Sequence, residues 1–295
     1  MRIATQWKDY TLLDCSGGER LERWGEVILI RPDPQVIWKG EKKHPLWSEA
    51  HARYIRSSSG GGHWETPGKA MPEEWTIRYG ELAFLVKPMG FKHTGLFPEQ
   101  AANWLLLDET IRNEDKGAKR RAAPRVLNLF AYTGGATLAC LAAGAHVTHV
   151  DAAKGMVDRA RNNARLSGLE HRPARWIVDD CMKFVRREIR RGNRYDIILL
   201  DPPSYGRGPG GEVWKLETEL HGFIELCGQL LGDDASLLML NAYSAELSPS
   251  VMQYLLASAL VPRLGGQAAC DEIGLPVEST GLALPCGSTA IWSRD

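Results

Sequence analysis

The sequence predicts an α/β chain in which a small β-rich region precedes a doubly wound parallel sheet. From about residue 125 onward, short apolar runs alternate with segments of helical character five times in succession. This alternation is typical of β-α units that build a parallel sheet. The first 95 residues instead carry short strand-like runs between turn residues, and the 295-residue length leaves room for one large and one small domain. We therefore expect a β-rich domain at 1–95, a connector at 96–124 and a larger domain at 125–295.

Two hairpins are expected in the N-terminal domain. One joins residues 26–30 to 35–38 around Pro32-Asp33-Pro34, and the other joins 75–79 to 81–86 around Gly80. Seven of the ten tryptophans precede residue 110. They favour the filling of a small β core, with stacking on unpaired RNA bases as the alternative, so this domain is a possible RNA contact.

Each remaining element of the larger domain follows from an apolar run or a helical segment. A polar, charged stretch closed by Pro124 precedes them. The strands are expected at 126–130, 147–151, 176–178, 197–201 and 237–241. The helices are expected at 137–143, 153–167, 182–191, 212–231 and 249–260.

Composition excludes several classes of protein. The six cysteines show no C-x-x-C spacing, and His146 and His149 fall on opposite faces of a strand, so we expect neither disulfides nor a metal site. No run of ~18 apolar residues and no signal sequence is present, which predicts a cytoplasmic protein away from membranes. The net charge is zero, yet residues 111–196 carry 18 basic and 9 acidic side chains. Such a segment either holds an anionic polymer such as RNA or forms solvated helix faces.

A glycine turn follows the first strand of the larger domain. The stretch Phe130-Ala131-Tyr132-Thr133-Gly134-Gly135 leads into a helix start, where free N–H groups can meet a carboxylate or phosphate. Alone this signal is weak, because many nucleotide folds have such a turn. NAD is the alternative ligand, but Tyr132 stands where a pyrophosphate cradle needs glycine and leaves room for the methionine part of S-adenosylmethionine (SAM).

Acidic residues end the next two strands. Asp151 stands 23 residues after Asn128, near the ~20-residue offset at which an acid meets a ribose diol, and Ala152 follows it. The third strand ends in Asp179-Asp180-Cys181, where an acid can accept from an adenine amine beside an apolar neighbour. The alternative is that Asp151 and Asp180 are plain helix N-caps.

The fourth strand ends in Asp201-Pro202-Pro203-Ser204-Tyr205, which resembles the catalytic loop of nucleic-acid methyltransferases that use SAM. Two prolines cannot continue a central strand, so the backbone must leave the sheet at its carboxyl edge. Ligands bind at this edge in open α/β sheets.

Taken in order, these segments resemble the bacterial large-subunit ribosomal RNA methyltransferase family, whose members make 5-methylcytosine or 7-methylguanine. The likeness covers about residues 90–295 and includes Lys92–Gln100, the glycine turn, Asp179-Asp180 and Asp201-Pro202-Pro203. It implies a Rossmann-like class I SAM methyltransferase sheet, mostly parallel with an antiparallel last strand. It also implies SAM as cofactor and RNA, first of all ribosomal RNA, as partner.

The resemblance assigns roles to residues of this chain. Gly134 and Gly135, with Tyr132 and Thr133, would approach the methionine moiety. Asp151 would meet the ribose, with Ala152 next to it also at the cofactor, Asp180 and Cys181 would meet the adenine, and Phe97 would close the pocket. The methyl-transfer site would be lined by Asp201, Pro202 and Pro203, with Tyr205 stacking on the base or serving as core filler.

The acceptor atom depends on a cysteine. Carbon 5 of cytosine needs activation by a thiolate, which the 5-methylcytosine branch of the family places just after the fifth strand. Here that stretch, residues 238–244, has no cysteine, and Cys286 is the remaining candidate. We therefore expect transfer to a base nitrogen. The alternatives are a DNA adenine methylase and a non-catalytic SAM-fold protein that binds RNA or a partner.

Overall fold

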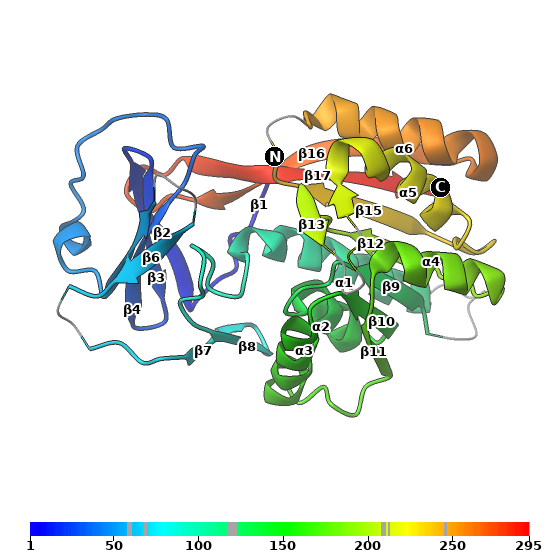
Figure 1. Ribbon diagram of the computed structural model, residues 1–295, viewed down its shortest axis with the longest axis horizontal. Helices are drawn as coiled ribbons and strands as arrows, with labels where there is room; N and C mark the ends of the chain where they lie inside the picture. The colour runs from blue at the N-terminus through cyan, green and yellow to red at the C-terminus, as the bar shows by residue number, and fades with distance from the viewer. Residues whose placement is uncertain are drawn as a thin grey trace. The chain divides into compact units, whose positions relative to one another are not determined.

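The computed structural model describes residues 1–57, 61–67, 70–116, 123–207, 211, 213–244 and 247–294. Its contacts divide the chain into two compact units. The small unit comprises Met1–Ala102 with Ile273–Cys286, and the large unit comprises Asn103–Glu272 with Gly287–Asp295. Figure 1 colours both along the chain. The expected division into 1–95, 96–124 and 125–295 stays a prediction.

The small unit is built on antiparallel hairpins. Its five-stranded sheet has the order β2-β3-β4-β5-β6, and a separate two-stranded sheet pairs β7 with β8. The strand bounds are β2 Tyr10–Ser16, β3 Glu19–Trp24, β4 Val27–Pro32, β5 Ala52–Arg56, β6 Gly62–Glu65, β7 Trp75–Tyr79 and β8 Leu82–Val86. Gly17 and Gly18 both have positive φ, as a two-residue hairpin loop requires, and they connect β2 to β3.

One of the two expected hairpins is confirmed and the other is wrong. β7 and β8 pair with Tyr79 opposite Leu82 around Gly80, whose φ is 55°. Residues 35–38 form no strand, because β4 pairs with β3 and β5 instead. The amides of Gly17 and Gly18 donate to the carbonyls of Trp38 and Val36, so this segment crosses the tip of the β2–β3 hairpin.

The large unit contains most of an eight-stranded sheet with the order β1-β16-β17-β15-β12-β9-β10-β11. Strands β15, β12, β9, β10 and β11 are mutually parallel, and β17 runs antiparallel to β15, as expected. The bounds are β1 Arg2–Ile3, β9 Arg125–Leu129, β10 His146–Asp151, β11 Ala174–Val178, β12 Ile197–Leu200, β15 Leu237–Ala242, β16 Gln267–Pro276 and β17 Ala283–Ser293. The predicted α/β fold is therefore confirmed.

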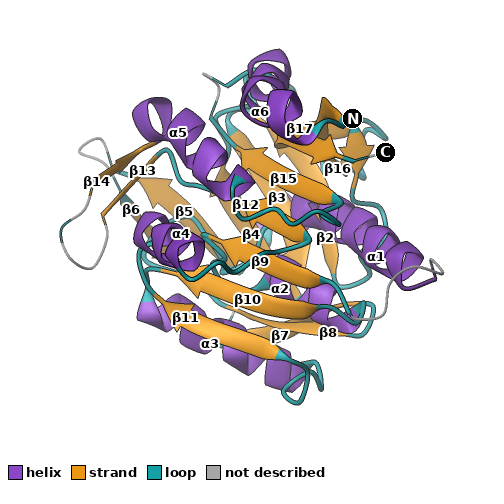
Figure 2. Ribbon diagram, turned by 90° about the vertical axis from the view of Figure 1, so that its right-hand side faces the viewer, coloured by secondary structure: helices purple, strands orange, loops and turns teal. Residues whose placement is uncertain are grey.

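Helices cover both faces of this sheet. Figure 2 shows α1, α2 and α3 on one face and α4, α5 and α6 on the other. The bounds are α1 Ala101–Lys116, α2 Gly135–Ala142, α3 Lys154–Leu166, α4 Cys181–Arg190, α5 Leu216–Gly228 and α6 Pro249–Leu264. Apolar side chains of α4, α5 and α6, among them Phe184, Phe223 and Leu256, pack against the sheet in one core. None of the helices in the described ranges has the length and apolar character needed to cross a membrane.

Two helix predictions need correction. The helix expected at 212–231 begins only at Leu216, because Val213–Lys215 form strand β14, which pairs with β13, Tyr205–Arg207. Helix α1 lies where no helix was expected. Its second half is polar, so the sequence of the whole segment does not show a helical apolar pattern. Its first half is apolar, and Trp104 and Leu107 there are buried.

Candidate active site

Four loops meet at the carboxyl edge of β9, β10, β11 and β12, where the sequence placed its candidate residues. The amide of Ala131 donates to Val150 O at 3.1 Å, and the amide of Asp179 donates to Asp151 O at 3.1 Å. The loops after the first three strands are thus bonded to one another. The structure brings together residues 130–135, 151–152 and 179–181.

The backbone of the glycine turn is left-handed at three of its six positions. Phe130 has φ 55°, Tyr132 has φ 50° and Gly134 has φ 89°. For a residue other than glycine such a conformation costs roughly 1–3 kcal/mol and persists only where its surroundings enforce it. Strain of this kind gathers at functional sites.

Asp151 is the main support of this turn. One carboxylate oxygen accepts the amide of Tyr132 and the other accepts the amide of Ala153, both at 2.8 Å. Burial raises the pKa of Asp151 above its ordinary value, although these two amides oppose the shift. Each carboxylate oxygen has a second lone pair, so Asp151 can hold the turn and still accept a ligand hydroxyl.

The two residues expected at the adenine have structural roles of their own. Asp180 caps α4, since its carboxylate accepts the amide of Lys183 at 2.8 Å, which is the N-cap alternative. Cys181 is buried, and its Sγ accepts the amide of Phe130 at 3.3 Å. Cys181 therefore contacts the turn through its thiol, and Asp180 precedes it as the N-cap of α4.

The two glycines are required by helix packing. A Cβ on Gly134 would stand 2.9 Å from Cβ of Ala160, and a Cβ on Gly135 would stand 2.6 Å from Cζ2 of Trp104. Trp104 is 3% exposed, so its indole has little room to move. The absence of side chains here lets α1 and α3 approach α2.

A buried polar chain lies behind the turn. Asn128 on β9 donates to Thr137 Oγ1 at 2.9 Å, and the Thr137 hydroxyl lies 2.9 Å from Nδ1 of His149 on β10. Burial lowers the pKa of His149 to about 3, so the imidazole is neutral at physiological pH. The ring packs against Trp176, with centroids 5.0 Å apart. This chain fixes the first turn of α2 to β9 and β10.

The Asp201-Pro202-Pro203 turn joins this site through Trp214. Trp214 Nε1 donates to the carbonyl of Pro203 at 2.7 Å, and its ring lies 5.2 Å from the ring of Phe130. Pro202 is buried, whereas Tyr205 is 52% exposed at the start of β13. The exposure of Tyr205 argues against core filling. Phe130 and Trp214 pack with Phe223, so one aromatic cluster connects the two turns.

Sequence reasoning missed the residues that stiffen the site. Trp214 was placed in a helix, although the runs around Tyr205 and Val213 on either side of a glycine-rich stretch are a hairpin signal. The sequence pattern does not identify Asn163 as a site residue. Its side-chain amide, on α3, donates to the carbonyl of Thr133 at 3.0 Å. A buried amide within a helix carries no local sequence signal.

Phe97 and Cys286 belong to the small unit. Phe97 lies against His93 there, and its expected role stays a prediction. Burial raises the pKa of the Cys286 thiol well above its ordinary value, and its Sγ lies 3.4 Å from Leu284 O. A thiol in this environment is a poor nucleophile.

Comparison with known proteins gives a consistent result. The family model described as S-adenosylmethionine-dependent methyltransferase matches residues 71–226, just over half of the chain. Ribosomal RNA large subunit methyltransferase I of Aeromonas salmonicida is 30% identical over 209 residues, which cover 70% of this chain and 48% of that protein. The Salmonella newport protein of the same name is 31% identical over 236 residues, covering 70% and 55%. The chain thus spans about half the length of these relatives.

Solved structures extend the likeness to the whole chain. A SAM-dependent methyltransferase from Agrobacterium tumefaciens superposes with a TM-score of 0.92 at 36% identity, covering 99% of this chain and 93% of that one. A structure from Streptococcus mutans has a TM-score of 0.72 at 19% identity, covering 98% and 76%. The second comparison shows the shared fold alone.

The contact between Gly135 and Trp104 makes Gly135→Ala a test of the packing around the turn. The added methyl group meets a buried indole ring, so we expect the free energy of unfolding to fall by about 1–3 kcal/mol in urea titrations. Gly222→Ala is the matched control, because Gly222 in α5 has open space around its Cβ position and alanine favours a helix. Equal stability of Gly135→Ala and the parent chain would contradict this packing.

The buried imidazole of His149 predicts a pH dependence of stability. Its pKa is near 6.5 in the unfolded chain and about 3 when folded, so the unfolded state binds the extra proton between these values. The contribution of the neutral His149 imidazole to the free energy of unfolding is fully present above pH 6.5. It is smaller by about 2 kcal/mol at pH 5. In His149→Gln the difference in unfolding free energy between pH 7 and pH 5 shrinks by that amount. His171→Gln, at an exposed histidine, leaves the difference unchanged, and identical pH dependence of the two variants would refute the assignment.

Proposed function

We propose that the chain, which belongs to the family of S-adenosylmethionine-dependent methyltransferases, methylates ribosomal RNA and transfers the methyl group to a base nitrogen. The relatives from Aeromonas and Salmonella are named for large-subunit ribosomal RNA, and they support RNA as the substrate class. Such a substrate places the enzyme in the cytoplasm. The cofactor is SAM, as the family model states.

The carboxyl edge of the sheet fits this cofactor. In our proposal the backbone of Tyr132-Thr133-Gly134-Gly135 receives the methionine part, and the left-handed conformation turns this backbone toward the ligand. Asp151 and Ala152 receive the ribose, since the Asp151 carboxylate keeps free lone pairs. Asp180, with one oxygen on the α4 cap, has the other for the adenine amine.

The remaining residues position the base that receives the methyl group. SAM supplies a methyl group on a sulfonium, and its displacement requires a nucleophile in line with the departing sulfur. The carbonyl of Pro203 is engaged by Trp214, so Asp201 and the carbonyl of Pro202 are our acceptors for hydrogen bonds from the base edge. Stacking on the exposed ring of Tyr205 would contribute roughly 1–3 kcal/mol.

The environment of the cysteines carries the preference for nitrogen. Carbon 5 of cytosine requires a thiolate, yet burial raises the pKa of Cys140, Cys181, Cys227 and Cys286 far above the neutral range, and that of Cys15 to about 11. Cys270 lies on β16, separated from β15 by β17. Asn241, at the end of β15, is bound to Asn103 and Thr289.

The proposed reaction is tested by incubation of the protein with tritiated SAM and undermethylated ribosomal RNA, followed by nucleoside analysis. We expect label in a base-nitrogen-methylated nucleoside. Label in 5-methylcytosine would refute the nitrogen preference, and label only in DNA would refute the RNA substrate.

Asp201→Ala is the control for that experiment. Because Asp201 is proposed to orient the base, this variant should lose transfer while calorimetry shows SAM binding close to that of the parent chain. Unchanged turnover would remove Asp201 from the mechanism.

The proposed ribose contact predicts that Asp151→Asn weakens SAM binding. Loss of hydrogen bonds to a charged acceptor corresponds to roughly 10- to 100-fold in Kd by calorimetry. Since burial raises the pKa of Asp151, affinity in the parent chain should fall on acidification at a higher pH than for an ordinary aspartate, and the asparagine variant should lack this decline. Asp158→Asn, at an exposed site on α3, is the control; equal affinities of all three proteins would exclude the contact.

A further inference from the structure

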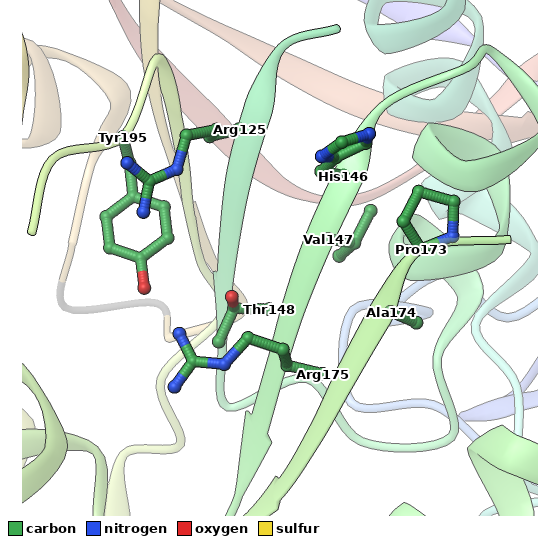
Figure 3. A pocket seen from close by; sticks show the side chains of 8 residues that line it. All are labelled: Arg125, His146, Val147, Thr148, Pro173, Ala174, Arg175 and Tyr195. Carbon is green, nitrogen blue, oxygen red and sulfur yellow. The ribbon is translucent and has the colours of Figure 1, made fainter.

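A hollow lies at the amino ends of the strands of the large sheet, at the edge opposite the candidate active site. The cavity measures about 280 Å³ and is lined by Arg125 at the start of β9, Thr148 on β10, Arg175 on β11 and Tyr195 just before β12, among others. Figure 3 shows these four side chains gathered on one side of the strands. A water molecule occupies about 30 Å³ of liquid, so a tetrahedral oxyanion fits together with several waters. We call this hollow the amino-edge notch.

Glu188, a fully buried acid beside the notch, already has hydrogen-bond partners for its carboxylate. Glu188 on α4 accepts the Tyr195 hydroxyl at 2.7 Å and the Asn193 amide at 2.8 Å, and it pairs with Arg191 at 3.2 Å. Although burial disfavours its charge, these hydrogen bonds hold the pKa of Glu188 below its ordinary value. The negative charge of Glu188 is therefore used by these donors within the protein. Tyr195, which donates to Glu188, lines the notch.

Positive charge remains in excess around the notch. The guanidinium of Arg125 lies over the Tyr195 ring at 5.3 Å, and no ion pair of Arg125 with a carboxylate is found among the described residues. Arg175 stands 3.6 Å from Glu188 with a side chain 47% exposed, so it also faces solvent. Asp196 uses one oxygen to accept the amide of Arg125. Among the described residues the lining of the notch thus includes two arginines, Arg125 and Arg175, and no carboxylate.

The notch contains part of the basic charge that the sequence concentrates in residues 111–196. Residues 111–196 hold twice as many basic as acidic side chains, and the arginines of the notch all belong to this segment. The acids of the candidate active site lie at the other end of the same strands. Arg125 and Arg175 place part of this basic charge at the amino edge, while other basic residues of the segment lie on α3 and α4.

We infer that the amino-edge notch binds a backbone phosphate of the RNA substrate through Arg125 and Arg175. Phosphate contacts from arginine fix the position of an RNA without reading its sequence. The notch would anchor the RNA at a second point while a base reaches the carboxyl edge. This inference rests on the proposed function, because it takes RNA to be the substrate.

The test measures equilibrium binding of undermethylated large-subunit ribosomal RNA to the full chain by filter retention, without SAM, between 50 and 200 mM salt. For Arg125→Gln combined with Arg175→Gln we expect about tenfold weaker binding at low salt. The plot of log affinity against log salt should lose about 1–2 units of slope. Arg165→Gln, at an exposed arginine on α3, is the matched control and should bind RNA like the parent chain. Calorimetry should give the same SAM affinity for all three proteins, which shows that the variants fold.

Other outcomes would overturn the inference. RNA affinity and salt slope equal to those of the parent chain would do so, as would an absence of RNA binding by the parent chain. Titration with inorganic phosphate distinguishes a site for an RNA backbone phosphate from a site for a free small anion. Phosphate bound by the parent chain but not by the double variant, with RNA affinity unchanged, would make the notch a small-anion site. If the double variant binds RNA more weakly but the parent chain transfers no tritium from SAM to RNA, only the proposed function is contradicted.

Discussion

The carboxylate of Asp151 holds the backbone of Tyr132 in a left-handed conformation, and the candidate active site depends on that hydrogen bond. Without it, Tyr132 would relax from its positive φ, since such strain persists only where neighbours enforce it. Cys181 and Asn163 secure the same turn at Phe130 and Thr133. These supports come from the two β-α units that follow the turn, β10-α3 and β11-α4, so the turn can form only when these strands are assembled beside β9. In this account the turn can bind a cofactor only after this part of the sheet has folded.

Aromatic packing connects the proposed cofactor turn, residues 130–135, to the proposed base-positioning turn, residues 201–203. Trp214 bonds to Pro203 and packs on Phe130, whose own amide is held by Cys181. A displacement of either turn would therefore displace the other through Trp214. This coupling suits in-line transfer, in which a small error in the placement of methyl donor and base lowers the rate steeply.

Sequence patterns predicted the features that are local and periodic. The five β-α units, the order of strand ends and the acids at those ends follow from apolar runs and turn residues, and the fold class was correct. The hairpin at β13–β14 was missed because its strands are short, and α1 was missed because half of it is polar. The roles of Trp104 and Asn163 were out of reach. Trp104 contacts Gly135 of α2, and Asn163 contacts the turn at Thr133; both contacts join segments that are distant in the chain and leave no periodic signal.

The most direct test of the central claim is a crystal structure of the chain with S-adenosylhomocysteine. Our account predicts the ribose hydroxyls within hydrogen-bond distance of Asp151, with φ of Tyr132 still positive. It also predicts the sulfur facing the Asp201-Pro202-Pro203 turn. A ligand bound away from the carboxyl edge, or a ribose that does not contact Asp151, would contradict it.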